Sequence, residues 1–207
     1  MKNITKIVLT GGPCAGKSAS VKWIQREFTE KGYKVLVVPE TATELITGGV
    51  APWTCGTPFE YQCCQMRLQL DKESVFMEAA NTMPEDKILI IYDRGMLDNL
   101  AYMSHDDFLK GLEKFKKTEK EVCEFYDAVF MLNSAANGVP EIYERNKEGN
   151  AARIENVEQA VELDNKLTKA WKIHPNFRVI ESSVGFDKKM HRLINDISTF
   201  LEEAKEA

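Results

Sequence analysis

The segment Gly11-Gly12-Pro13-Cys14-Ala15-Gly16-Lys17-Ser18 follows an apolar run at 7–9 and precedes an amphipathic helical pattern that stops at Gly32. It matches the spacing G-x-x-x-x-G-K-[ST] at every fixed position. That spacing has chemical meaning when it joins a strand to a helix, which is its context here. The segment therefore predicts a strand, a loop that binds phosphate groups and a helix, in that order.

The chemistry expected of this loop follows from its backbone. Glycines let backbone amides turn toward phosphate oxygens, and the N-terminus of the next helix adds the positive end of its dipole. We expect Lys17 to reach the β- and γ-phosphates of ATP or GTP and Ser18 to bind Mg²⁺. The predicted nucleotide-binding residues are Gly11, Gly12, Pro13, Cys14, Ala15, Gly16, Lys17, Ser18 and Ala19.

Four further apolar runs, at 35–38, 88–91, 128–132 and 177–180, extend this pattern along the chain. Most are continuous rather than alternating, as expected for strands that are covered on both faces. Segments with helical spacing lie between them, including a short one at 41–48 and a long one at 59–80. Strands that alternate with helices imply a parallel sheet. We therefore predict a three-layer α/β/α sandwich with a five-stranded parallel sheet.

Composition limits the classes of protein. The chain has 207 residues, of which 43% are hydrophobic and 29% charged, so extensive disorder and fibrous architectures are excluded, and one domain over 1–207 is expected. Its net charge of −5 argues against a broad nucleic-acid surface. No apolar run approaches the roughly 20 residues that a membrane span needs, so a cytoplasmic location is expected. The cysteines and histidines form no metal-ligand motif.

Carboxylates follow two of the predicted strands. Asp93, with Arg94 beside it, comes just after the run at 88–91, and Glu40 ends the strand at 35–38. Because strand C-termini line the ligand crevice of an open α/β sheet, both acids are expected to face Lys17. Asp93 is then a second ligand for Mg²⁺ besides Ser18, and Glu40 accepts a hydroxyl proton or positions a water. For both acids, capping of a helix N-terminus is the structural alternative.

Taken together, the sequence resembles the deoxynucleoside-kinase-like branch of P-loop proteins. It is more closely similar to the NadR-type P-loop domain, often labelled AAA-like. That group includes the ribosylnicotinamide kinase domain of bacterial NAD regulators and the GTP-binding domain of an animal TRP-channel trafficking factor. The resemblance covers nearly the whole chain and is carried by the segments 11–18, 37–46, 59–67, 92–102 and 153–171. It implies a P-loop NTPase fold.

The resemblance also implies roles for single residues. Glu40 corresponds to the base that accepts the acceptor's hydroxyl proton. Gln62, in an F-x-x-Q pattern with Phe59, corresponds to a residue that contacts the acceptor's base, and Asp98 to a carboxylate that helps to recognise it. The pair of Asp93 and Arg94 matches an acid-Arg pair. For Gln62 and Asp98 the alternative is a surface position on a helix.

Two features leave the acceptor undefined. The sequence has Asp-Arg-Gly at 93–95 where nucleoside kinases commonly have an acid, Arg and Ser, so the acceptor need not be a nucleoside. Trp53 lies in a loop after Glu40, where it would either close over an acceptor or anchor the loop on the core.

The segment 143–156 resembles the small helical lid of P-loop kinases. Arg145 and Arg153 would then fold over the transferred phosphate and neutralise its charge. The alternative is a solvated basic turn between helices.

The sequence thus favours a Mg²⁺-dependent kinase whose catalytic residues are Lys17, Glu40, Asp93, Arg94, Arg145 and Arg153. Its partners would be a nucleoside triphosphate and a small-molecule acceptor. The alternative is a nucleotide-dependent binding module or switch with weak NTPase activity. A mechanical AAA+ motor is disfavoured by the short chain. The identity of the acceptor, the preference for ATP or GTP and the oligomeric state, with a homodimer among the options, stay open.

Overall fold

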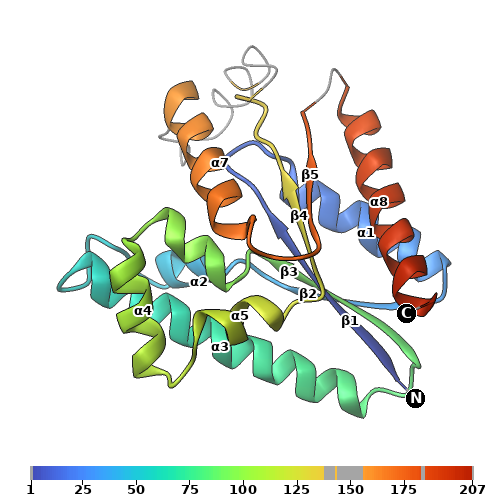
Figure 1. The fold of residues 1–207 in the computed structure, drawn as a ribbon, viewed down its shortest axis with the longest axis horizontal. Helices are drawn as coiled ribbons and strands as arrows, with labels where there is room; N and C mark the ends of the chain where they lie inside the picture. Colours follow the sequence, from blue (N-terminus) through green and yellow to red (C-terminus); the bar gives the residue numbers. More distant parts are fainter. Residues whose placement is uncertain (1, 138–142, 144–155, 183–184, 207) are drawn as a thin grey trace.

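The computed structural model describes residues 2–137, 143, 156–182 and 185–206, which are drawn in colour in Figure 1. The predicted lid at 143–156 lies outside the described residues, apart from its first and last positions. Nothing structural is therefore stated for Arg145 or Arg153.

Five parallel strands form the central sheet of the described part of the chain, in the order β2-β3-β1-β4-β5. One strand arises from each predicted apolar run, which confirms the predicted parallel sheet. Their bounds are β1 (Asn3–Thr10), β2 (Lys34–Val38), β3 (Lys87–Asp93), β4 (Ala128–Leu132) and β5 (Phe177–Ile180).

Helices connect and cover these strands. Polar residues precede several of them, as Thr57 does when its hydroxyl accepts the backbone N–H of Glu60 at the start of α3. The described helices are α1 (Lys17–Glu30), α2 (Thr41–Thr47), α3 (Pro58–Thr82), the 3₁₀ helix η1 (Met96–Ala101), α4 (His105–Lys114), α5 (Glu119–Glu124), α7 (Val157–Trp171) and α8 (Phe186–Glu206).

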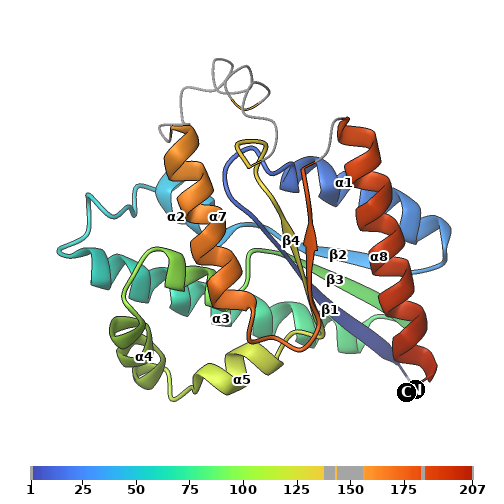
Figure 2. The same cartoon turned by 45° about the horizontal axis from the view of Figure 1, so that its top comes forward.

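The sheet is covered on both faces, which accounts for its continuous apolar strands. On β3, Leu89 and Ile91 pack against the core beneath α1 and α8, while Ile88 and Ile90 pack against the core beneath α3, α4, α5 and α7. Figures 1 and 2 show these two helical layers on opposite sides of the sheet. Within the described ranges, every helix is too short or too polar to cross a lipid bilayer.

The register of the sheet brings its functional loops to one edge. Leu9 of β1 lies beside Asp93 of β3, and Val38 of β2 lies beside Tyr92. Since all strands are parallel, the loops that follow them leave from the same edge. The loop after β1, Glu40 after β2 and Arg94 after β3 are therefore neighbours.

Candidate functional site

The loop between β1 and α1 borders a cavity of about 460 Å³ at this edge of the sheet. We call it the phosphate cavity. The part of the loop from Gly12 to Ala19 lines it, and Glu40 and Arg94 form further walls. Tyr102 and Leu163, which sequence patterns did not single out, also line it. The structure thus brings together the predicted loop, the predicted base and the predicted arginine.

Close approach and backbone angles explain the glycines of the loop. Gly11 has a φ of +146°, and a Cβ there would lie 2.2 Å from the carbonyl oxygen of Leu132. Gly16, which precedes α1, has a φ of +91°. Only glycine adopts such angles without strain, so both positions depend on it.

Lys17 begins α1 and folds back on the loop. Its Nζ donates a hydrogen bond to the carbonyl oxygen of Gly11 at 3.0 Å. Burial lowers the pKa of Lys17, and the positive charge of Arg94 lowers it further, whereas the charges of Asp93 and Glu40 oppose the change. The ammonium group therefore lies among both cationic and anionic groups at the edge of the phosphate cavity.

Glu40 is held by an arginine and a hydroxyl group. Its Oε1 accepts a hydrogen bond from Nε of Arg94 at 2.5 Å, and its Oε2 accepts one from the hydroxyl of Thr43 at 2.6 Å. Although Glu40 stands at the N-cap position of α2, its side chain makes no capping hydrogen bond. Burial favours its neutral form, but the charges of Arg94 and Lys17 outweigh burial and lower the pKa of Glu40 to about 2.

Asp98 holds Arg94 from the other side. It accepts hydrogen bonds from Nη1 of Arg94 at 3.1 Å, the hydroxyl of Thr10 at 2.5 Å, the backbone N–H of Gly95 at 2.9 Å and Nε1 of Trp171 at 3.0 Å. Only 2% of Asp98 is exposed. Its oxygens are thus engaged by the protein itself, whereas the sequence resemblance assigned Asp98 to recognition of a base.

Gly95 makes room for Trp171. A Cβ on Gly95 would lie 2.6 Å from the indole ring, closer than packed carbon atoms approach. The ring must reach this position for its N–H to bond Asp98. The glycine that departs from the kinase pattern is therefore explained by packing, and Trp171 both packs against Gly95 and donates to Asp98.

Asp93 retains an unused oxygen. Its Oδ1 is buried and has no hydrogen-bond partner among the residues that the structure describes. Burial raises the pKa of Asp93, and the charge of Lys17 opposes that rise. This carboxylate oxygen and the hydroxyl of Ser18, which is exposed, are oxygen donors of the kind that Mg²⁺ prefers. In proteins Mg²⁺ usually binds only one or two carboxylates, and substrate phosphates and waters complete its coordination. These residues fit a magnesium ion that binds together with a nucleotide.

The two α3 residues assigned to acceptor binding differ in their surroundings. Gln62 is buried, and its Oε1 has no hydrogen-bond partner within the described residues. Phe59 instead packs beneath Lys114, whose Nζ lies 4.5 Å from the ring centroid. Neither residue lines the phosphate cavity. Gln62 keeps an acceptor available, while Phe59 faces α4.

Sequence patterns missed a group of residues that brace the loop from behind. Asp164 of α7 accepts hydrogen bonds from the backbone N–H of Gly12 at 2.9 Å and that of Ser134 at 2.6 Å. Lys189 of α8 donates to the carbonyl oxygen of Ala15 at 2.8 Å, and burial lowers the pKa of Lys189 to about 8. No local pattern marks these residues, because their partners in the phosphate loop, Gly12 and Ala15, are more than 150 positions away in the chain.

The comparisons with known proteins agree with this geometry. Residues 6–189 match the family described as AAA domain, which comprises P-loop NTPases. The comparison with curated proteins finds no match. A P-loop AAA domain implies nucleotide binding, and the loop, Lys17 and the cavity beside them supply the chemistry for it. The chain belongs to the AAA domain family of P-loop NTPases.

Proposed function

We propose that the protein is a Mg²⁺-dependent kinase that transfers the γ-phosphate of ATP or GTP to a hydroxyl group of a nucleoside-like or other small metabolite. The observation that carries this proposal is the carboxylate of Glu40. It borders the phosphate cavity, is oriented by Arg94 and Thr43, and makes no capping bond to α2. A site for nucleotide binding alone has less need of an oriented carboxylate beside the loop.

The low pKa of Glu40 is compatible with this role. At a pKa of about 2, Glu40 stays ionised at neutral pH and can accept a hydrogen bond from an acceptor hydroxyl. Phosphoryl transfer has a loose transition state in most descriptions, so positioning and charge neutralisation matter more than the strength of the base. Glu40 therefore chiefly orients the hydroxyl and receives its proton once the phosphoryl group has begun to transfer.

Positive charge at the cavity serves the transferred group. Lys17 and Arg94 both border it and would neutralise the negative charge of the phosphates. Asp98 is a positioning residue for Arg94, because its oxygens are engaged by protein donors. Arg145 and Arg153, outside the described residues, stay predicted lid arginines.

Ser18 and Asp93 would hold the magnesium ion. An ion held there would supply positive charge that neutralises the phosphates. The buried Oδ1 of Asp93, which has no hydrogen-bond partner among the described residues, supports this assignment. The Oε1 of Gln62 likewise has no donor in the described part of the chain. A buried amide oxygen of this kind gains from a ligand N–H or O–H, which supports the assignment of Gln62 to the acceptor.

The decisive experiment compares transfer with nucleotide binding. The protein is incubated with ATP or GTP and a panel of nucleosides, ribosylnicotinamide and phosphorylated metabolites. Glu40→Gln should lower transfer about 100-fold or more, the contribution of a positioned general base, and leave Mg-nucleotide affinity nearly unchanged. Glu44→Gln is the matched control, because Glu44 lies on α2 and pairs with Lys72 at 3.0 Å. Equal loss of binding and transfer in Glu40→Gln would assign Glu40 a structural role.

A nucleotide-dependent switch is the second candidate, and Trp53 is the observation that favours it. The side chain is 74% exposed in the connection between α2 and α3, so it does not anchor that connection on the core. An exposed tryptophan close to Glu40 in the chain offers a surface that a protein partner would bury. A switch should hydrolyse nucleotide slowly, ignore every small acceptor and capture its partner only with nucleotide bound.

A further inference from the structure

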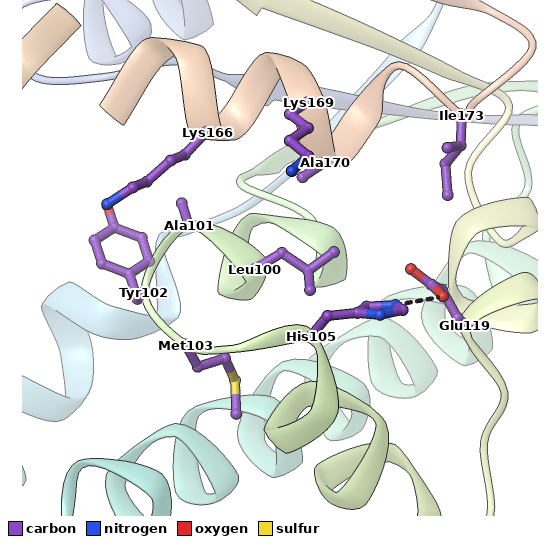
Figure 3. A pocket seen from close by; sticks show the side chains of 10 residues that line it. All are labelled: Leu100, Ala101, Tyr102, Met103, His105, Glu119, Lys166, Lys169, Ala170 and Ile173. Atoms are coloured by element: carbon purple, nitrogen blue, oxygen red, sulfur yellow. Dashed lines mark hydrogen bonds and ion pairs between the residues drawn. The ribbon is translucent and has the colours of Figure 1, made fainter. Parts of the chain in front are cut away.

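A second cavity, of about 640 Å³, lies between η1 and the C-terminal half of α7 (Figure 3). Its other walls are the loop after η1 and the first residues of α4 and α5, His105 and Glu119. This volume lies within the range of about 300–1,000 Å³ that is typical of small-molecule sites. Among the described residues, Tyr102 alone lines both this cavity and the phosphate cavity.

Much of the lining is apolar, and two of its large side chains are exposed to water. Leu100, Met103 and Ala170 form part of it; in Figure 3 the Leu100 side chain lies between η1 and α7, whereas the Met103 side chain extends away from α7. Ile173 at the rim is 61% exposed, and Tyr102 is 48% exposed. Large apolar side chains left uncovered around a concave space are typical of a surface that an apolar ligand covers.

The charged groups of the cavity are mostly cationic. Lys166 and Lys169 lie three positions apart on α7 and thus on one helix face. Lys166 pairs with Glu162 at 2.8 Å, but Lys169 has no carboxylate partner within the described part of the chain. At the far wall, Nε2 of His105 bonds the carboxylate of Glu119 at 3.0 Å, so that acid is already engaged.

We propose that this cavity is a binding site for an organic anion that has an apolar or aromatic body, such as an aromatic carboxylate. The anionic group would lie between Lys166 and Lys169, and the body would cover Met103, Ala170 and Ile173. Both ammonium groups are on exposed side chains, and that of Lys169 has no carboxylate partner among the described residues. The site is separate from the phosphate cavity and does not depend on kinase activity.

Tyr102 connects the two cavities, because its side chain lines both of them. Its side chain points toward Lys166 in Figure 3 and also forms part of the wall that includes Arg94 and Glu40. A ligand that packs against this ring would restrict it on both sides. Binding of an anion in the second cavity is thus expected to change the affinity of the phosphate cavity for its ligand, and the change must be reciprocal.

The probe for this site is 1-anilinonaphthalene-8-sulfonate, a fluorescent aromatic anion. It is titrated into the full chain in the presence of saturating Mg-ADP, which occupies the phosphate cavity. Saturable binding of one probe per chain is expected. The double substitution Lys166→Gln and Lys169→Gln should weaken it about tenfold, since each cation at a half-exposed rim contributes a factor of a few. Lys172→Gln, on an exposed neighbour outside the cavity, should leave it unchanged.

A second readout locates the probe without relying on charge. In protein labelled at methionine methyl groups, the probe should shift the resonance of Met103, assigned through Met103→Leu. The resonance of Met190, buried in the core on the opposite face of the sheet, should stay in place. Equal probe affinity in the double variant and the wild type, or an unmoved Met103 resonance at saturation, would overturn the proposal. Neither result bears on phosphoryl transfer.

Discussion

A buried carboxyl group on α3 should make the stability of the protein depend on pH. Glu73 is 4% exposed and accepts a hydrogen bond from the hydroxyl of Tyr126. That hydroxyl in turn accepts the backbone N–H of Met96 at 2.9 Å, at the start of η1. Burial raises the pKa of Glu73 from 4.5 to about 7, although the bond from Tyr126 opposes the rise.

The sign and size of the effect follow from this difference. Between pH 4.5 and pH 7 the unfolded chain gives up the Glu73 proton while the folded chain keeps it, so the free energy of unfolding falls as pH rises and levels off above pH 7. Each pH unit between the two pKa values contributes about 1.4 kcal/mol, so the full effect is about 3 to 4 kcal/mol. Glu73→Gln removes the ionisation and keeps an oxygen for Tyr126. The free energy of unfolding of Glu73→Gln minus that of the wild type should therefore be about 2 to 3 kcal/mol higher at pH 8 than at pH 5.

The assay is urea unfolding followed by far-ultraviolet circular dichroism at pH 5 and pH 8 for both proteins. Glu78→Gln is the matched control, because Glu78 lies on the same helix and is exposed. It should change the free energy of unfolding by less than about 0.5 kcal/mol at either pH. If the difference between Glu73→Gln and the wild type were the same at both pH values, the argument from burial would be refuted.

Two further predictions concern the support of Arg94. Gly95→Ala would place a Cβ 2.6 Å from the ring of Trp171. It should lower the free energy of unfolding, measured by chemical denaturation, by about 1–3 kcal/mol. An unchanged free energy of unfolding would mean that the Trp171 ring shifts without cost. Asp98→Asn replaces an acceptor oxygen by a donor facing Arg94 or Trp171 and should cost about 1–3 kcal/mol in the same assay. Wild-type stability in Asp98→Asn would show that these hydrogen bonds contribute little.

Local patterns predicted most of the fold. The apolar runs at 88–91 and 128–132 became strands because both faces of the sheet are covered, and a continuous run is the local mark of that burial. The helix predicted at 59–80 is observed as α3, from Pro58 to Thr82. Its start is marked by Thr57 and Pro58, which cap and begin a helix through contacts within one turn. Such features depend on neighbouring residues and are therefore visible in sequence.

The candidate site was predictable in part. Glu40 and Arg94 follow strands of a parallel sheet, so topology alone brings them to the loop. The role of Asp98 was not visible, because two of its four donors are Thr10, 88 positions earlier, and Trp171, 73 positions later. The packing of Phe59 could not be predicted either, because the ammonium group over its ring belongs to Lys114 of α4.

The primary structure alone specified the parallel sheet, the phosphate loop and the carboxylate after β2, because each is encoded in contiguous residues with their own backbone preferences and chemistry. Tertiary packing decided which groups remain free to act. It engaged both side-chain oxygens of Asp98. It left one side-chain oxygen on each of Asp93 and Gln62 without a hydrogen-bond partner among the described residues, and it formed a second cavity beside Tyr102. These outcomes depend on hydrogen bonds and contacts between distant segments, and no local pattern records them.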